Sequence, residues 1–149
     1  MIFRDATPND IPQIQRVRNS VRENTLSNPA LVSDADCLEY LTVRGKGWVC
    51  EVEGQVVGFA IADLREDNIW ALFVDPGIER RGVGKTLQKM MLEWYFAQGK
   101  DRVWLGTAAG TRAETFYGRT GWSQNGMHGK ELRFEMTAGE YLNAKLRDN

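Results

Sequence analysis

A basic, glycine-rich loop between an apolar strand and a long amphipathic helix is the feature that most constrains the fold of this chain. Residues 69–74 form an unbroken apolar run that predicts a buried strand. Apolar residues then recur at helical spacing over 83–95, and Gly99 ends the helix that they predict. Arg102–Thr107 predicts the next strand, with alternate side chains on one face. A strand, a helix and a strand in this order predict a crossover connection within one sheet.

The N-terminal third predicts a short strand followed by two helices. Residues 2–4 open as the strand, and residues 7–10 have the chemistry of a helix start. The apolar residues of the first helix are Ile11, Ile14, Val17 and Val21. Residues 24–29 break this helix. The capping and apolar residues of the second, shorter helix are Ser33 or Asp34, Leu38 and Leu41.

The rest of the chain supplies further strands and a last helix. Apolar residues alternate with others over 47–53, and a turn leads into an almost continuously apolar run at 56–64 that predicts a central strand. The later elements are a helix at 112–120, strands at Trp122 and 131–136, and a helix with the capping box Thr137 and Glu140. One domain over residues 1–149 is expected, of the α+β class, with a central twisted sheet, mixed but mostly antiparallel, flanked by helices.

Size and charge exclude several classes of function. The chain has 149 residues, the usual length of one domain. Its net charge is −1 and it has no long basic block, so no nucleic-acid partner is expected. The apolar stretches are too short to span a membrane, and residues 1–5 lack the basic flank and apolar run of a signal peptide. We therefore expect a cytoplasmic protein without a membrane partner.

Histidine and cysteine are too few for a metal site or a disulfide framework. His128 is the single histidine and no Cys-x-x-Cys occurs, so no metal is expected. Cys37 and Cys50 are too few to form a disulfide framework in a chain of this size. Residues 125–129 predict a turn, so His128 is expected to be a solvated turn residue rather than a catalytic one.

The loop at 80–85 combines three features that bind anions. The first turn of a helix offers unpaired N–H groups and the positive end of the helix dipole. Gly82 and Gly84 let the backbone come close to a phosphate. The basic residues of the loop are Arg80, Arg81 and Lys85. A pyrophosphate group would fit here.

Three interpretations of this loop stay open on spacing alone. A P-loop would need a glycine where the chain has Glu79, and the dinucleotide-binding fingerprint would need a third glycine where it has Leu87. In the third interpretation, the glycines only shape the turn between a strand and a helix.

The wider pattern decides among them. Residues 72–76, the loop at 80–85 and the Phe-Tyr-x-x-x-Gly-Trp pattern at 116–122 resemble the two motifs of the GNAT superfamily of N-acetyltransferases. The order of elements is similar to that superfamily from the first strand to Met136. The resemblance implies a GNAT-like fold and an enzyme with acetyl-CoA as co-substrate. It also implies direct transfer of the acetyl group to a primary amine in a ternary complex.

The resemblance further implies where acetyl-CoA binds. The cleft would open where the strands at 69–74 and 102–107 splay apart, with the pantetheine arm on strand backbone and the pyrophosphate on the glycine loop. Many members carry an Asn that contacts the cofactor where this chain has Gly110. Arg112 is the candidate substitute, and the alternative is that Arg112 is an ordinary solvated arginine. The expected cofactor-binding residues are Leu72, Phe73, Val74, Arg80, Arg81, Gly82, Val83, Gly84, Lys85 and Arg112.

The expected catalytic groups follow from the same resemblance. Tyr117 would protonate the departing thiolate, and a backbone N–H at 73–74 would bind the oxyanion. In the family, the link between the first two helices lines the acceptor side. The expected acceptor-binding residues are Arg22, Glu23 and Asn24. Glu23 is the candidate general base, Asp63 and Glu51 are weaker candidates, and a chain of water molecules would also suffice.

The acceptor itself is expected to be a small-molecule amine, such as an amino acid or a polyamine-like metabolite. One alternative is acetylation of a protein N-terminus or lysine. Another is a non-catalytic regulatory module that binds coenzyme A. Turnover of acetyl-CoA with any amine distinguishes the enzymes from the module. A homodimer and a monomer both stay open.

Overall fold

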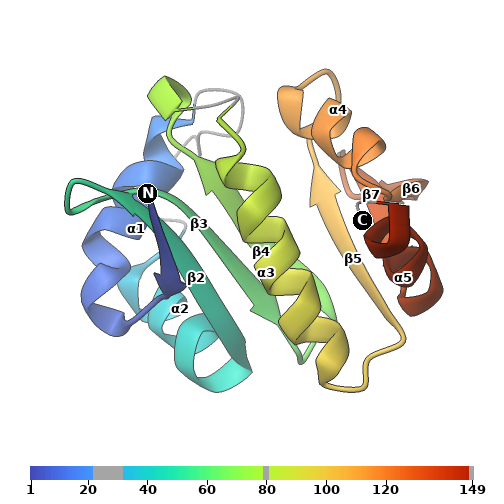
Figure 1. Ribbon diagram of the computed structural model, residues 1–149, viewed down its shortest axis with the longest axis horizontal. Coiled ribbons are helices and arrows are strands. Elements are labelled where there is room, and N and C mark those ends of the chain that lie inside the picture. The colour runs from blue at the N-terminus through green and yellow to red at the C-terminus, as the bar shows by residue number, and fades with distance from the viewer. Residues whose placement is uncertain (22–31, 79–80, 148–149) are drawn as a thin grey trace.

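Seven strands pair into one mixed sheet, in the order β1-β2-β3-β4-β5-β7-β6 (Figure 1). The structure is a computed structural model, and it describes residues 1–21, 32–78 and 81–147. The strands are β1 (Ile2–Asp5), β2 (Gly45–Val52), β3 (Gln55–Asp63), β4 (Asn68–Val74), β5 (Arg102–Thr107), β6 (Ser123–His128) and β7 (Glu131–Thr137). Strands β4 and β5 run parallel, and the other neighbouring pairs are antiparallel. The predicted α+β class and the mostly antiparallel sheet are confirmed.

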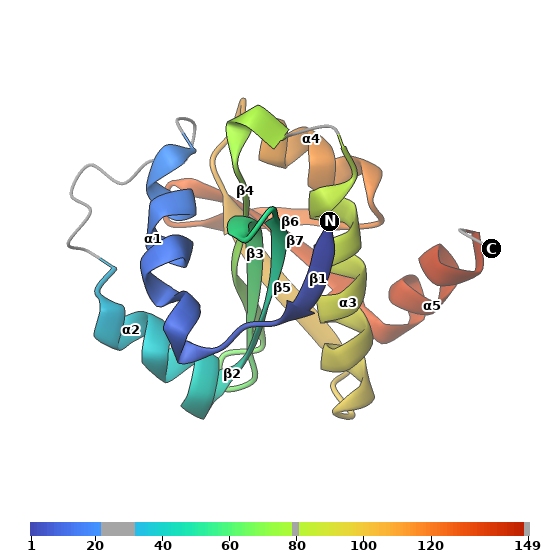
Figure 2. The same ribbon diagram turned by 60° about the vertical axis from the view of Figure 1, so that its left-hand side comes forward.

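Helices cover both faces of this sheet. They are α1 (Ile11–Ser20), α2 (Asp34–Glu39), α3 (Val83–Ala97), α4 (Arg112–Arg119) and α5 (Ala138–Arg147). Figure 2 shows α1 and α2 on one side of the sheet and α3 on the other. The unit β4–α3–β5 is the predicted crossover. Within the described ranges, none of the helices is long and apolar enough to cross a membrane.

Two apolar cores lie on opposite faces of β3. The buried residues that α3 contributes to one core include Val83, Leu87, Met91 and Tyr95. Those that α1 contributes to the other are Ile11, Ile14 and Val17. In β2, Trp48 and Cys50 belong to the α3 core, whereas Val49 belongs to the α1 core. The side chains of β2 therefore alternate between the two faces of the sheet, as predicted. Both faces are buried at β2, because helices cover both faces of the sheet.

Three details of the sequence prediction are wrong. His128 ends β6 instead of lying in a turn. Gly126 lies within the strand, at the irregularity where the β6–β7 register shifts between Gln124 and Met127. Helix α1 ends at Ser20, so Val21 is extended. Leu38 is exposed, because Cys37 and Leu41, four residues apart, share the face that meets the core. The predicted helix break at 24–29 lies outside the described residues.

Local hydrogen bonds start two of the helices as predicted. The Ser33 hydroxyl accepts a hydrogen bond from the backbone N–H of Asp36 at 3.0 Å, which caps α2. The Thr137 hydroxyl accepts from the N–H of Glu140 at 3.1 Å, and the Glu140 carboxylate accepts from the N–H of Thr137 at 3.0 Å. The capping box of α5 is thus complete.

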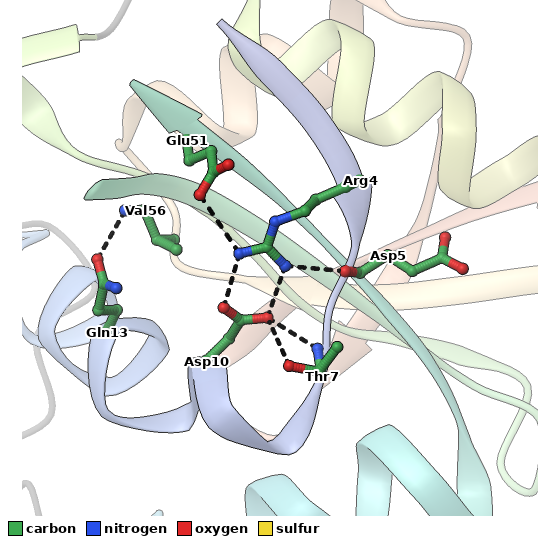
Figure 3. A network of polar contacts seen from close by, with 7 residues as sticks. All are labelled: Arg4, Asp5, Thr7, Asp10, Gln13, Glu51 and Val56. Atoms are coloured by element: carbon green, nitrogen blue, oxygen red, sulfur yellow. Dashed lines mark hydrogen bonds and ion pairs between the residues drawn. The ribbon is translucent and has the colours of Figure 1, made fainter. Parts of the chain in front are cut away.

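An ion pair attaches the start of α1 to the edge of the sheet (Figure 3). Arg4 on β1 donates to both carboxylate oxygens of Asp10, at 2.8 and 2.9 Å, and its guanidinium also lies 3.4 Å from Glu51. Asp10 is 5% exposed and also accepts from the backbone N–H of Thr7 at 2.8 Å. The hydrogen bonds from Arg4 are the main cause that lowers the pKa of Asp10 below 3.8.

Replacing Asp10 with asparagine is expected to lower the free energy of unfolding by about 1.5–3 kcal/mol at neutral pH, since charged hydrogen bonds are lost. Because the folded-state pKa of Asp10 is depressed, its contribution is present above pH 3.8 and is lost as the pH falls through the folded-state pKa. Urea unfolding at several pH values should show the difference shrinking in acid. Asp5→Asn, at an exposed carboxylate, is the matched control, and equal loss in both variants would contradict the prediction.

Candidate active site

The parallel strands β4 and β5 separate toward their carboxyl ends. They share one register pair, Asn68 with Trp104, and the N–H of Trp104 donates to the carbonyl of Asp67 at 3.1 Å. By contrast, β4 stays paired with β3 up to Val74, and β5 stays paired with β7 up to Thr107. Beyond this pair, β4 and β5 share no further register pair, so the β5-facing edge of β4 is unpaired toward its carboxyl end, as strand splaying requires. Figure 1 shows the two strands diverging toward α4.

A cleft of about 800 Å³ opens where these strands part. Its walls are the end of β4, the start of α3, helix α4 and one side of α5. The predicted cofactor-binding residues that line it are Leu72, Phe73, Val74, Gly82, Val83, Gly84, Lys85 and Arg112. Arg81 does not line it. Arg80 lies outside the described residues.

The glycines at the start of α3 have different roles. Gly82 is the residue before the first turn of the helix, and its φ of 80° lies in the left-handed region that favours glycine. Gly84 has an ordinary helical backbone. A Cβ atom on Gly84 would lie 3.5 Å from Val74 and 3.8 Å from Phe116, both of which line the cleft. The first N–H groups of α3 and the positive end of its dipole lie at this wall.

The charge of the cleft has one sign. Its basic lining residues are Lys85, Lys89, Arg112, Arg119, Lys145 and Arg147, and no carboxylate of the described residues lines it. The whole chain has a net charge of −1, so this concentration of cations is local. An electropositive cleft at a helix N-terminus suits a ligand with several phosphates. Within the described part of the chain, no group of three or more potential metal ligands occurs.

The sequence prediction missed four of these cations. Lys89 lies four residues after Lys85 on α3, so helical spacing alone could have placed it on the same wall. Arg119 ends α4, whereas Lys145 and Arg147 come from α5. Only the tertiary structure brings α5 to the cleft, and no local pattern in the sequence indicates this.

Tyr117 on α4 lies in the wall of the cleft and in the α3 core at once. It is 6% exposed, and its ring contacts Phe116, Trp122 and Phe134 with centroid distances of 5.3, 5.7 and 6.0 Å. Burial raises its pKa above the ordinary value of 10.0, so the phenol is protonated at neutral pH. Trp122 is fixed beside it, because its indole N–H donates to Gln88 on α3 at 3.0 Å.

The comparisons with known proteins identify the family. Residues 12–122 match the model of the Acetyltransferase (GNAT) family. The chain belongs to the GNAT acetyltransferase family. The predicted family and enzyme class are thereby confirmed, and acetyl-CoA is the acyl donor of this N-acetyltransferase. A search of curated proteins gave no match.

Solved GNAT structures share the fold over almost the whole chain. The PaiA N-acetyltransferase of Thermoplasma acidophilum, in complex with coenzyme A, is 14% identical with a TM-score of 0.79, covering 91% of this chain and 98% of that one. The ribosomal-protein-alanine N-acetyltransferase of Brucella melitensis is 25% identical with a TM-score of 0.74, covering 92% and 99%. The ribosomal-protein-S18-alanine N-acetyltransferase of Escherichia coli is 18% identical with a TM-score of 0.71, covering 91% and 90%.

The structure describes only part of the acceptor side of this GNAT enzyme. The predicted acceptor residues Arg22, Glu23 and Asn24 lie outside the described residues. Val21, which precedes them, lines the cleft, so the end of α1 reaches it.

The two weaker base candidates lie elsewhere and do not line the cleft. Asp63 accepts hydrogen bonds from Arg44 at 3.0 and 2.6 Å and is buried against that residue. Glu51 lies on β2 and belongs to the ion-pair network that Arg4 of β1 forms with the start of α1. Neither carboxylate can therefore deprotonate an amine at the cleft.

Proposed function

We propose that this GNAT enzyme transfers the acetyl group of acetyl-CoA directly to the primary amine of a small molecule, within a ternary complex. The cleft between the splayed strands carries the proposal, because it joins free strand backbone, a helix N-terminus and six basic side chains in one cavity. Acetyl-CoA requires this combination, since it has amides in its pantetheine arm and phosphates at its other end.

The donor has a natural orientation in this cleft. Over Leu72, Phe73 and Val74, the backbone groups of β4 that face away from β3 would pair with the pantetheine amides, as a neighbouring strand would. The start of α3, from Gly82 to Lys85, would bind the pyrophosphate. This orientation puts the thioester near the middle of the sheet, at the point where β4 and β5 part.

The chemistry then needs three groups. The amine nitrogen attacks the thioester carbonyl, the carbon–sulfur bond breaks, the amine loses a proton and the thiolate gains one. A backbone N–H of Phe73 or Val74 would stabilise the oxyanion, and Tyr117 would protonate the sulfur. Glu23, or a chain of water molecules, would take the proton of the amine.

A second candidate acceptor is the N-terminal amine of a protein. The Brucella melitensis structure favours it, because that ribosomal-protein-alanine N-acetyltransferase is 25% identical and is covered over 99% of its length. The near-neutral net charge of this chain instead favours a small molecule, since it gives no general attraction for a basic protein substrate.

Acetyl-CoA is expected to stabilise the fold by about 2.7 kcal/mol at a hundredfold excess over its dissociation constant. Thermal unfolding with and without acetyl-CoA measures this. An amine panel is then assayed by release of free thiol, with small amines in one arm and N-terminal alanine peptides in the other. Thiol release with peptides alone would replace the small-molecule acceptor with a protein. Stabilisation without any thiol release would indicate a coenzyme A-binding module.

A further inference from the structure

Arg18 is the buried cation on the α1 face of the sheet. It lies near the end of α1 and is 6% exposed, and it is the only fully buried basic residue in the described ranges. Its guanidinium carbon lies 4.7 Å from the ring centre of Trp70, 5.2 Å from that of Phe73 and 5.6 Å from that of Phe59. Three aromatic rings thus enclose a planar cation.

The same stack of rings ends in a second arginine. Trp70 stacks on Tyr40, with a centroid distance of 4.0 Å and an interplanar angle of 6°. Arg44 covers the far face of this pair, 4.4 Å from Tyr40. The order along the stack is therefore Arg44, Tyr40, Trp70 and Arg18.

The two arginines differ in their partners. Arg44 donates two hydrogen bonds to the carboxylate of Asp63. In Arg18, by contrast, Nε and Nη2 are buried and have no hydrogen-bond partner among the described residues. The Cys37 thiol lies close enough to interact, but burial raises its pKa, so it stays neutral and supplies no counter-charge.

An unpaired buried guanidinium is costly and therefore informative. Burial lowers the pKa of Arg18, yet a guanidinium stays protonated in proteins, so a positive charge is held without an anion among the described residues. Native structures rarely leave buried donors without a partner from the protein, from water or from a bound group. The planar fork of donors matches a carboxylate, which accepts two parallel hydrogen bonds.

The position of Arg18 connects it to the reaction. Trp70 and Phe73, which enclose its guanidinium, belong to β4, and Phe73 also lines the cleft. Val21, three residues after Arg18, lines the cleft as well. In the β3–β4 register, Ala71 pairs with Ile61 and Ile69 pairs with Ala62, so Trp70 is the extra residue of a β-bulge. The bulge lets Trp70 and its neighbour Ala71 both pack in the α1 core. Arg18 itself does not line the cleft, but an amine that reaches the thioester from the α1 side would pass Val21 and Phe73, next to its guanidinium.

We propose that Arg18 binds a carboxylate of the acceptor, so that the preferred substrates of this enzyme are amino carboxylates such as amino acids. The inference rests on the proposed small-molecule acetyltransferase activity. The aromatic rings would hold the guanidinium in place, and the carboxylate would complete its two unpaired donors. Arg18 would thereby orient the amine at the other end of the same molecule toward the acetyl group.

Matched pairs of acceptors test the proposal. Glycine, β-alanine and γ-aminobutyrate are compared with their amides, which keep the amine but lack the charge. In the wild type, kcat/KM should be roughly 10–100-fold higher for the carboxylate of the best pair, the range of one charged hydrogen-bond pair. Arg18→Gln should remove this preference by raising KM for the carboxylates, while KM for acetyl-CoA and rates with the amides stay unchanged.

Two further variants show whether the effect belongs to the guanidinium. Arg18→Lys keeps the charge but not the planar fork, so it should restore only part of the preference. Arg16→Gln removes a half-exposed arginine of the same helix that pairs with Asp75, and it should keep the full preference. Urea unfolding shows whether each variant is folded. If Arg18→Gln does not fold, Arg18→Lys is used to test the carboxylate preference instead.

The outcomes separate this inference from the proposed function. If amines are acetylated but carboxylates and amides react equally, and Arg18→Gln changes nothing, the inference is overturned and the function stands. If no amine is acetylated, thermal unfolding in the presence of coenzyme A instead compares how far each carboxylate and its amide stabilise the protein. Stabilisation by the carboxylates that disappears in Arg18→Gln supports the inference without the activity, and equal stabilisation overturns both.

Discussion

Gly84→Leu is expected to raise the dissociation constant of acetyl-CoA at least about a hundredfold, so that its stabilisation falls from about 2.7 kcal/mol to about 0.4 kcal/mol or less. A Cβ atom at this position makes ordinary contacts, 3.5 Å from Val74 and 3.8 Å from Phe116, so the backbone has no need of glycine. The rest of a leucine side chain would extend into the cleft, where the proposed function places the phosphates of acetyl-CoA at the first turn of α3. Isothermal titration calorimetry with acetyl-CoA measures the loss.

The fold should tolerate this change, because leucine favours a helix more than glycine does. Gly118→Leu is the matched control, since it lies on α4, is exposed and has no neighbouring atom within 4 Å of its Cβ position. The control should bind acetyl-CoA as the wild type does. Gly84→Leu with unchanged affinity would mean that the phosphates do not bind at the start of α3.

Local patterns were enough to predict most of the fold. The apolar run at 69–74, the helical spacing over 83–95 and the strand Arg102–Thr107 each specify their own conformation, and together they specify the crossover. The burial of Val49 could not be predicted, because it depends on α1 and α2 covering a second face of the sheet. The strand at His128 was missed because glycine in a bulge gives the same local signal as glycine in a turn.

The site was predictable where it is local in sequence and not where it is tertiary. Residues Gly82 to Lys85 combine glycine, charge and a helix start within a few positions, so the sequence alone indicated an anion site. Lys145 and Arg147 reach the same cleft from α5, more than fifty residues away in the sequence. Arg18 stands between Val17 and Asn19 and looks like an ordinary surface residue of α1 until Trp70 and Phe73 enclose it.

Tyr117→Phe is expected to lower kcat by roughly 10²–10⁴-fold and to leave the affinity for acetyl-CoA close to that of the wild type. The change removes one oxygen and keeps the ring, which packs against Phe116, Trp122 and Phe134. Since the hydroxyl has no hydrogen-bond partner within the described residues, the free energy of unfolding should hardly change. A coenzyme A thiolate is a fairly good leaving group, which favours the lower end of the range. Steady-state kinetics at saturating acetyl-CoA measure the effect.

Tyr95→Phe is the control with the opposite expectation. The Tyr95 hydroxyl donates to the carbonyl of Arg102 at 2.7 Å in the same core, so its loss should cost about 1 kcal/mol of stability and leave kcat unchanged. Burial raises the pKa of Tyr117 above 10.0, which keeps the phenol protonated as the pH rises, so deprotonation of this acid should not reduce kcat between neutral pH and pH 10. A Tyr117→Phe enzyme with full kcat would assign the proton on the thiolate to another donor, such as water, and leave Tyr117 a packing residue of the cleft wall.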